Sequence, residues 1–454
     1  MIMKKLMFLI INLCIMYMIG GCKKFLDEKP GSKMATPETV RDQQALLDQY
    51  NNLNMNSPAS LEISADNYYL TKEDWDRLSD DLKRMHLWEK DHLFETPPND
   101  WNYLYRTIYI ANTVIEYGEK LNVKEETNNV LGQAYFWRGF SFQKAAFIWC
   151  LAYDEASAGN DLGIPLRLKA DFNEVSVRGS VADTYRQIIS DFKKSIELLP
   201  AKSIHPMRPS LPAAYGMLAK TYLAMRMYDS VYKYANLGLQ LRMDPQDYND
   251  SRILPAANFP FSNLKYNNSD IIFQSAGSPT LALAVTRGRI DSLLYSSYET
   301  NDLRRVIYFR RIIDNIYGFK GSYEGGNSLF AGMTVGELYL MRAEAACRRG
   351  NIQSALEDLN FLLLNRWKTG TFNPINITDQ ALLLNNILLE RRKELLMRGH
   401  RWMDIKRLNK EGSNINLVRK LDGQVYMLTA GDLRFALPIP EDVIELSGML
   451  QNPR

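Results

Sequence analysis

Residues 338–363 read LYLMRAEAACRRGNIQSALEDLNFLL. In the second half of this stretch, four residues recur at the spacing that places side chains on one face of an α-helix: Ala355, Leu359, Leu362 and Leu363. Large residues alternate with small ones on this face, and such a surface lets two helices approach closely as an antiparallel pair. The stretch therefore predicts closely packed, paired helices.

The same stretch resembles one unit of the tetratricopeptide repeat, a helix–turn–helix of about 34 residues. Four residues match its aromatic, small, turn and second-helix positions: Tyr339, Ala343, Gly350 and Ala355. Four more fit a second copy: Tyr215, Ala219, Tyr222 and Ala235. Residues 191–200 resemble the end of a further unit, and residues 101–150 have the length and helical spacing for another. The repeats are not contiguous, so a simple solenoid is not expected.

The helical pattern is interrupted by long irregular segments. Residues 243–332 are rich in Asn, Ser, Gly, Pro and Tyr, and residues 62–100 are polar, aromatic and weakly periodic. Long inserts in a helical body often carry the binding residues. We therefore expect a mainly α protein whose scaffold spans about 101–242 and 333–410, with the two inserts forming a ligand face.

Composition narrows the class of protein. The chain has 454 residues, of which 46% are hydrophobic and 24% charged, with 55 Lys and Arg against 52 Asp and Glu. These values are typical of a globular protein with a large core and exclude a disordered chain or a polytopic membrane protein. A net charge of +3 is too balanced to suggest a nucleic-acid partner.

The N-terminus has the features of a lipoprotein signal. Two lysines precede an apolar run at residues 6–19, which is too short to span a bilayer and fits a signal peptide. The run ends in IGGC at 19–22, which resembles the bacterial lipobox. We predict that residues 1–21 are removed and that Cys22 is acylated. The mature chain, 22–454, would then be a single globular domain tethered to a membrane.

The remaining cysteines predict no disulfide scaffold. Cys14 leaves with the signal peptide, so Cys150 and Cys347 are the only unmodified cysteines of the mature chain. Both lie in apolar helical sequence, and we expect buried free thiols.

Signatures of catalysis and of metal binding are missing from the sequence. The four histidines lack the spacing of a metal site, and no phosphate-binding loop or nucleophile elbow is found. One cluster of acids comprises Asp74, Asp76, Asp80 and Asp81. We interpret it as a solvated helix face, although spacing alone excludes neither a glycosidase pair nor a calcium site. We predict no catalytic residue, cofactor or metal.

Three blocks of sequence occur in a specific order. The first comprises GIPL at 163–166, TYRQIISDF at 184–192 and LLP at 198–200, and the second is LYLMRAEA at 338–345. The third comprises ERRKEL at 390–395, Gly399, RW at 401–402 and DIKR at 404–407, followed by LPIP at 437–440 and QNP at 451–453. In this order, behind a lipobox, the blocks resemble the SusD/RagB family of Bacteroidetes outer-membrane lipoproteins. The resemblance covers nearly the whole chain.

The third block also has a plain structural interpretation. Glu390, Glu394 and Arg398 are spaced four apart, as in helix-stabilising pairs, and Gly399 can end the helix. Arg401 and Asp404 are expected to pair with charged residues of the last helices. We interpret the block as structural, with no role in ligand binding.

The resemblance implies a binding protein without catalysis. Members of the family lie on the outer membrane facing the exterior, and they capture oligosaccharides, or peptides in some branches. They deliver the ligand to a SusC-like TonB-dependent transporter, which contacts the tetratricopeptide side. The implied fold is the SusD-like α-helical fold, with about four tetratricopeptide-like helix pairs and irregular loops forming the ligand face.

Candidate ligand-binding residues are the aromatic and polar side chains of the two inserts, because sugars present apolar faces and many hydroxyls. The first insert offers Trp75, Tyr68, Tyr69 and Trp88, with Asp66 and Asn67 nearby. The second insert offers Tyr295, Tyr298, Arg304 and Tyr323. Trp75 is the strongest candidate, because it lies among charged residues with no apolar stripe to join. For each aromatic, a place in the core remains the alternative.

Five tryptophans in helical or motif segments are assigned to the core: Trp101, Trp137, Trp149, Trp367 and Trp402. Two other functions stay open at this stage. One is a helical glycoside hydrolase that uses some of the aspartates. The other is a periplasm-facing tetratricopeptide adaptor with only protein partners.

Overall fold

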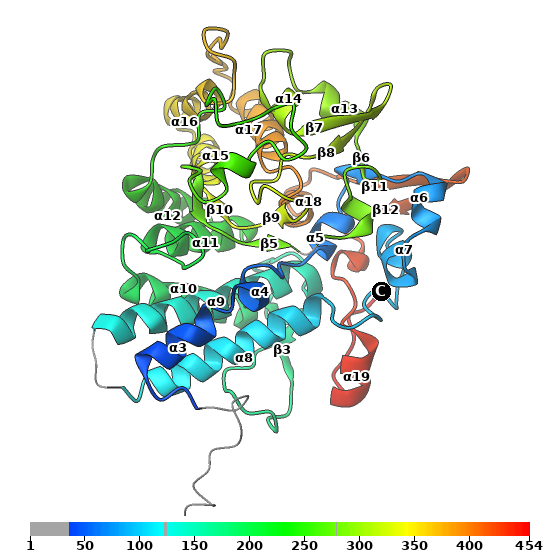
Figure 1. The fold of residues 1–454 in the computed structure, drawn as a ribbon. Coiled ribbons are helices and arrows are strands. Elements are labelled where there is room, and N and C mark those ends of the chain that lie inside the picture. Colours follow the sequence, from blue (N-terminus) through cyan, green and yellow to red (C-terminus); the bar gives the residue numbers. More distant parts are fainter. Residues whose placement is uncertain (1–35, 122–124, 278) are drawn as a thin grey trace, which may run out of the picture. The chain divides into compact units, whose positions relative to one another are not determined.

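The computed structural model describes residues 36–121, 125–277 and 279–454 (Figure 1). The chain divides into two units, residues 1–39 and Val40–Arg454, and the second unit holds every helix and strand that the structure describes. The predicted signal peptide and the predicted lipid-bearing Cys22 lie outside the described residues.

Long helices form a row in the first half of the second unit, and each packs against the next from α8 to α12 (Figure 1). Asn99 and Ser180 begin two of them with a side-chain oxygen that accepts backbone N–H bonds, as capping residues do. The five helices are α8 (Asp100–Gly118), α9 (Glu125–Trp149), α10 (Val181–Leu198), α11 (Leu211–Ala224) and α12 (Tyr228–Leu241).

A second group of helices continues the row after the long insert. α15 packs against α12 and also against α16 and α17. The turn between α15 and α16 has Gly350 at φ +79°, a left-handed conformation that glycine adopts without strain, so its predicted place as the turn residue is confirmed. The mainly α fold with paired, tetratricopeptide-like helices is confirmed. The helices are α15 (Val335–Arg348), α16 (Ile352–Leu364), α17 (Gln380–Glu394) and α18 (Arg401–Asn409).

The inserts consist of short elements. The segment before α8 holds α5 (Ser60–Ile63), β1 (Tyr68–Tyr69), α6 (Lys72–Asp76) and α7 (Asp80–His86). The segment between α12 and α15 holds β4 (Ile271–Phe273), β5 (Ala276–Gly277), β6 (Arg289–Ile290), α13 (Ser292–Ser296), α14 (Arg304–Ile307), β7 (Phe309–Ile313), β8 (Ile316–Phe319), β9 (Leu329–Phe330) and β10 (Met333–Thr334). The other elements are α3 (Val40–Leu47), α4 (Tyr50–Leu53), β2 (Leu162–Pro165), β3 (Arg178–Ser180), β11 (Leu417–Leu421), β12 (Gln424–Leu428) and α19 (Glu441–Ser447).

A four-stranded sheet joins the two inserts, in the order β1-β6-β8-β7 (Figure 1). Tyr69 pairs with Arg289, and Arg289 pairs in turn with Gly318. A Cβ atom at Gly318 would lie 1.8 Å from the carbonyl oxygen of Val285, so only glycine allows this close approach. Segments more than 200 residues apart are thereby fixed side by side.

Aromatic rings fill the core between the helices and the sheets. Trp137 meets Phe273 at a centroid distance of 5.2 Å, and Trp149 meets Trp101 at 4.9 Å. The core assignment is confirmed for four of the five tryptophans, namely Trp101, Trp137, Trp149 and Trp402. Trp367 is only half-buried. The two thiols are also free and buried, as predicted: Cys150 and Cys347.

The third sequence block is held in the core by ion pairs. Glu394 accepts hydrogen bonds from Arg366 and Arg304, and all three side chains are fully buried. Its partners are therefore remote in sequence, and no ion pair with Arg398 is formed, because both oxygens of Glu394 face those two arginines. The structural interpretation of the block stands, with a more extensive network than helix spacing alone predicts.

Arg401 has a partner that the sequence did not indicate, whereas Asp404 pairs as expected. Arg401 reaches Asp66 of the first insert through two hydrogen bonds of 2.7 and 2.9 Å, whereas a partner in the last helices was expected. Asp404 pairs with Arg391 and Arg407, as expected for the last helices.

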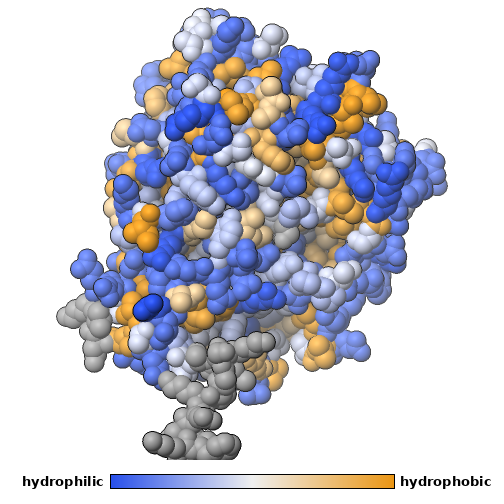
Figure 2. Space-filling view, viewed as in Figure 1, coloured by the Kyte–Doolittle hydropathy of each residue, from blue (hydrophilic) through white to orange (hydrophobic). Residues whose placement is uncertain are grey.

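Apolar side chains are scattered among polar ones on the face drawn in Figure 2. Among the described residues, no helix combines the length and the hydrophobicity that crossing a bilayer requires.

Candidate functional site

The place where the two inserts meet is held by a buried ion pair. Asp74 of α6 contacts Arg289 of β6, and Thr71 begins α6 by accepting the backbone N–H of Asp74. Burial would raise the pKa of Asp74, but the hydrogen bonds from Arg289 and Thr71 outweigh it and lower that pKa. The helix that carries Trp75 is thus attached to the central sheet.

Two predicted aromatic residues of the first insert remain available to solvent. Tyr69 is 38% exposed, and Trp75 is half-buried. The ammonium groups of Lys72 and Lys83 lie 5.4 and 5.6 Å from the Trp75 ring, and its Nε1 donates to the carbonyl of Lys83. The indole is therefore fixed in place: it packs partly against the hydrophobic core, contrary to the expectation that it has no apolar neighbours, and keeps part of its surface exposed.

A hollow of about 340 Å³, called here the outer hollow, lies in the second insert. It is lined by Phe259, Leu281, Leu283, Val285 and Leu329 among other apolar side chains. Polar residues reach its rim and walls: Asn258, Thr280, Thr286, Lys320, Ser322 and Asn327. An apolar hollow with a few polar groups fits a small ligand or one end of a larger one.

The polar groups of the outer hollow differ in what they already contact. Lys320 donates to the carbonyls of Pro255 and Ala257, and Ser322 donates to the carbonyl of Ser328. By contrast, the buried hydroxyl oxygen Oγ1 of Thr280 has no partner among the described residues. A buried hydroxyl without a partner is unfavourable, so a hydrogen bond from a ligand or water would be gained there.

The outer hollow and Tyr69 lie on the same face of the sheet. Directly paired residues of neighbouring strands point to the same side, so Tyr69, Arg289 and Gly318 share one face. The carbonyl of Val285, which lines the outer hollow, approaches Gly318 from that face. We call this surface, formed by Tyr69 and the outer hollow together with Trp75 of the attached helix α6, the insert face.

Tyr295 belongs to a different surface. Its ring stacks on Tyr317 of β8 at a centroid distance of 3.7 Å, and Arg305 lies 5.2 Å from it. Because Tyr317 precedes Gly318 in the strand, it points to the opposite side of the sheet. The structure therefore does not bring Tyr295 together with Tyr69.

Three other predicted residues of the first insert are enclosed. The Tyr68 hydroxyl donates to the carbonyl of Ile63 at 3.0 Å, and Trp88 Nε1 donates to that of Ser64 at 2.9 Å. The Asn67 amide donates to Glu62 at 2.7 Å. All three side chains are at most 3% exposed, so they pack in the interior of the protein.

Asp66 is partly exposed but already engaged. It makes the bidentate contact with Arg401 and a further ion pair of 3.4 Å with Arg392. Burial alone would raise the pKa of Asp66, but Arg401 and Arg392 lower it far below the usual range. The carboxylate therefore links the first insert to α17 and α18.

The predicted residues of the second insert other than Tyr295 are also enclosed. Tyr298 donates to the carbonyl of Lys393 at 2.9 Å, and Tyr323 donates to Asp270 at 2.7 Å. Arg304 contacts Asp302, Glu390 and Glu394 with no exposed surface. These three side chains are therefore bonded to partners within the fold.

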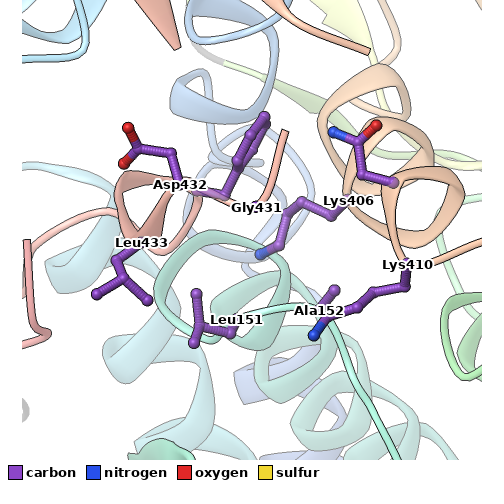
Figure 3. A pocket seen from close by; sticks show the side chains of 9 residues that line it. Leu151, Ala152, Lys406, Lys410, Gly431, Asp432 and Leu433 are labelled. Atoms are coloured by element: carbon purple, nitrogen blue, oxygen red, sulfur yellow. The ribbon is translucent and has the colours of Figure 1, made fainter. Parts of the chain in front are cut away.

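Another hollow of about 340 Å³ lies outside the inserts, where α18 meets the loop after α9 (Figure 3). Lys406 donates to the carbonyls of Phe147 and Cys150, and Lys410 pairs with Asp154 at 3.1 Å. The lysines of this hollow are thus already bonded to other groups of the protein. For this reason the insert face is the stronger candidate for ligand binding.

Most of the aspartates in the acidic cluster form ion pairs. Asp76 pairs with Lys72 and Asp80 with Lys83, in addition to the pair between Asp74 and Arg289. No group of three or more His, Cys, Asp or Glu side chains is arranged to hold a metal ion in the part of the chain that the structure describes.

The lining of the outer hollow was not identified from the sequence. Its residues come from 258–259, 279–286 and 319–329, and they mix large apolar side chains with small and amide ones. Enrichment in Asn, Ser and Pro marked the segment as an insert, but no spacing within it indicated which side chains meet.

Paired helices that support an irregular, partly aromatic face define a helical-scaffold binding protein. The family model described as starch-binding and associating with the outer membrane matches residues 24–223, and the model of the SusD family matches residues 246–453. The chain belongs to the SusD/RagB family, and the resemblance seen in the sequence is confirmed.

Individual relatives agree with this assignment. The SusD-like protein P2 of Formosa agariphila is 25% identical in an alignment 414 residues long that covers 78% of this chain and 79% of that protein. A SusD superfamily protein of Bacteroides thetaiotaomicron has a TM-score of 0.71 at 22% identity, covering 92% of this chain and all of that one. A putative sugar binding protein of Bacteroides vulgatus has a TM-score of 0.75 at 20% identity, covering 92% and 99%. The last two comparisons bear on the fold.

Proposed function

We propose that this chain is a cell-surface lipoprotein that captures an oligosaccharide on the insert face, without hydrolysing it. The observation that supports the proposal is the juxtaposition of Tyr69 and the outer hollow on one side of the sheet that joins the two inserts, with Trp75 on the helix that the Asp74–Arg289 ion pair attaches to that sheet. Exposed rings stack on the apolar faces of sugars, and the amide and hydroxyl groups of the hollow suit sugar hydroxyls. The name of the Bacteroides vulgatus relative favours sugar over peptide as the ligand.

Replacing both Tyr69 and Trp75 with alanine is expected to weaken oligosaccharide binding at least tenfold. Each lost aromatic contact removes about 0.5–1.5 kcal/mol beyond the apolar contact area. Isothermal titration with maltoheptaose, cellohexaose, laminarihexaose and oligogalacturonate measures this, using the glycan that binds the wild type.

Phe172→Ala is the matched control. This ring is 78% exposed and stacks on Tyr109, between β2 and β3 and outside both inserts, so its removal should leave the affinity unchanged. The proposal fails if the wild type binds none of these glycans, or if the double variant binds as tightly as the wild type.

We also propose that Cys22 carries the lipid that anchors the chain in the outer membrane, facing the exterior, and that the chain delivers its ligand to a SusC-like TonB-dependent transporter. The lipobox-like residues 19–22 and the family support this. Because two or three acyl chains anchor a protein firmly, Cys22→Ser should move it from the membrane to the soluble fraction.

Cell fractionation and immunoblotting measure that shift. Cys150→Ala is the control, since this thiol is free and buried and should not affect anchoring. Added protease should remove the wild type from intact cells. Protection from protease would argue against the exterior location and in favour of a periplasmic role.

A further inference from the structure

A second, much smaller hollow lies next to the outer hollow. The two share Leu283 and Leu329 in their walls. The smaller one, called here the inner hollow, has a volume of about 20 Å³, which is enough for one water-sized group. It is lined on its other sides by residues of α5 and α9 and of the segment after α17.

Two buried cations line the inner hollow. Lys144 of α9 is 2% exposed and Arg398 is 4% exposed. In the described parts of the chain, no carboxylate lies within ion-pair distance of either one, and Lys144 Nζ makes no hydrogen bond. The polar contacts of Arg398 are long, at 3.4 Å to the Thr334 hydroxyl and 3.5 Å to the Tyr308 hydroxyl.

Aromatic rings are the closest compensation for these charges. Lys144 Nζ lies 5.4 Å from the Phe140 ring, and the Arg398 guanidinium lies 4.2 Å from the Tyr323 ring. Three other arginines with no more than 1% exposure each contact at least two carboxylates, namely Arg304, Arg366 and Arg407, and Arg391 contacts Asp404. Since a buried charge without a counter-charge is unfavourable, an anion bound beside Lys144 and Arg398 would stabilise both.

The acids around this pair already have other partners, including Glu394, which accepts from Arg366 and Arg304. Glu62 also lines the inner hollow, but its oxygens accept from the Asn67 amide at 2.7 Å and the Gly399 backbone N–H at 3.0 Å. Glu337 contacts Lys220 at 3.0 Å and His400 at 3.5 Å. The lining of the inner hollow therefore carries two cations, Lys144 and Arg398, against one carboxylate, that of Glu62.

We propose that Lys144 and Arg398 bind a small anionic group in the inner hollow, either a halide ion or one carboxylate. The volume admits a group about the size of a water molecule, such as a halide ion or the oxygen end of one carboxylate, and the two cations supply the charge that selects it. A halide would come from solvent. A carboxylate would come from an acidic ligand on the insert face, because the two hollows share walls. The site itself does not depend on the proposed capture of glycans.

Anomalous diffraction from crystals soaked in sodium bromide tests the proposal on the whole mature chain. The expected result is a bromide peak that contacts Lys144 Nζ and the Arg398 guanidinium, and that is absent from Lys144→Met crystals. Lys72→Met, which removes an exposed lysine, should keep the peak. A wild-type map with bromide only on the protein surface would overturn the proposal, even if Lys144→Met failed to fold.

A second soak distinguishes the two sources of the anion. If trigalacturonate removes the bromide peak while maltotriose does not, the group is a ligand carboxylate. If the peak survives both sugars, the group is a bound halide. Either result supports the anion site, whereas water density without bromide in all three crystals would overturn it.

Discussion

Glu394→Gln is expected to lower the free energy of unfolding by about 3–5 kcal/mol. The Glu394 oxygens accept from Arg366 Nε and Nη2 at distances of 2.9–3.1 Å and from Arg304 Nη1 at 3.2 Å. The three side chains have no exposed surface, so the change leaves two buried guanidinium groups with less negative charge. Urea unfolding followed by tryptophan fluorescence, with far-UV circular dichroism as a second probe, measures the loss.

Asp76→Asn provides the control for this experiment. It removes an ion pair with Lys72 whose two side chains are 44% and 49% exposed, and such pairs contribute at most about 1 kcal/mol. If Glu394→Gln cost no more than Asp76→Asn, the buried network would not be a main source of stability, and the structural interpretation of the third block would lose its support.

The long helices could be predicted from the sequence because their signal is local. Residues four apart face the same side of a helix. The spacing of residues around Tyr339, Gly350 and Ala355 therefore indicates two helices and a turn within one repeat. The partners of Glu394 could not be predicted in this way. Arg366 and Arg304 are 28 and 90 residues away, and helix spacing pointed to Arg398 instead.

The insert face depends on contacts that leave no pattern in the sequence. β1 has two residues, so no alternation shows which of Tyr68 and Tyr69 points inward. The choice is made by the pairing with β6, more than 200 residues away, and by Arg419, which lies 4.9 Å from the rings of both Tyr68 and Trp88. The sequence located the inserts, but it could not separate the exposed rings from the buried ones.

Lys144→Met is expected to raise the free energy of unfolding by about 4 kcal/mol at pH 6 in buffers free of halide, and by almost nothing near pH 10.5. Burial, with Lys220 as a further cause and Glu337 opposing both, lowers the pKa of Lys144 to about 7 from an ordinary value of 10.5. Below pH 7 the folded protein keeps a buried charge, and each unit of pKa difference corresponds to about 1.4 kcal/mol. Between pH 7 and 10.5 the unfolded chain binds the proton and the folded one does not, so the wild type gains stability as pH rises.

Urea unfolding of the wild type and of Lys144→Met at pH 6, 8 and 10 in a gluconate salt measures this difference. Contributions of groups far from Lys144 cancel between the two proteins, which isolates the titration of Lys144 and of its neighbours Lys220, Glu337, Glu62 and Arg398. Lys72→Met, an exposed lysine, should show no such trend. An equal effect of Lys144→Met at all three pH values would mean that the ammonium group is not desolvated. A smaller gain at pH 6 after sodium bromide is added is expected, because an anion bound beside Lys144 stabilises the charged form in the wild type alone.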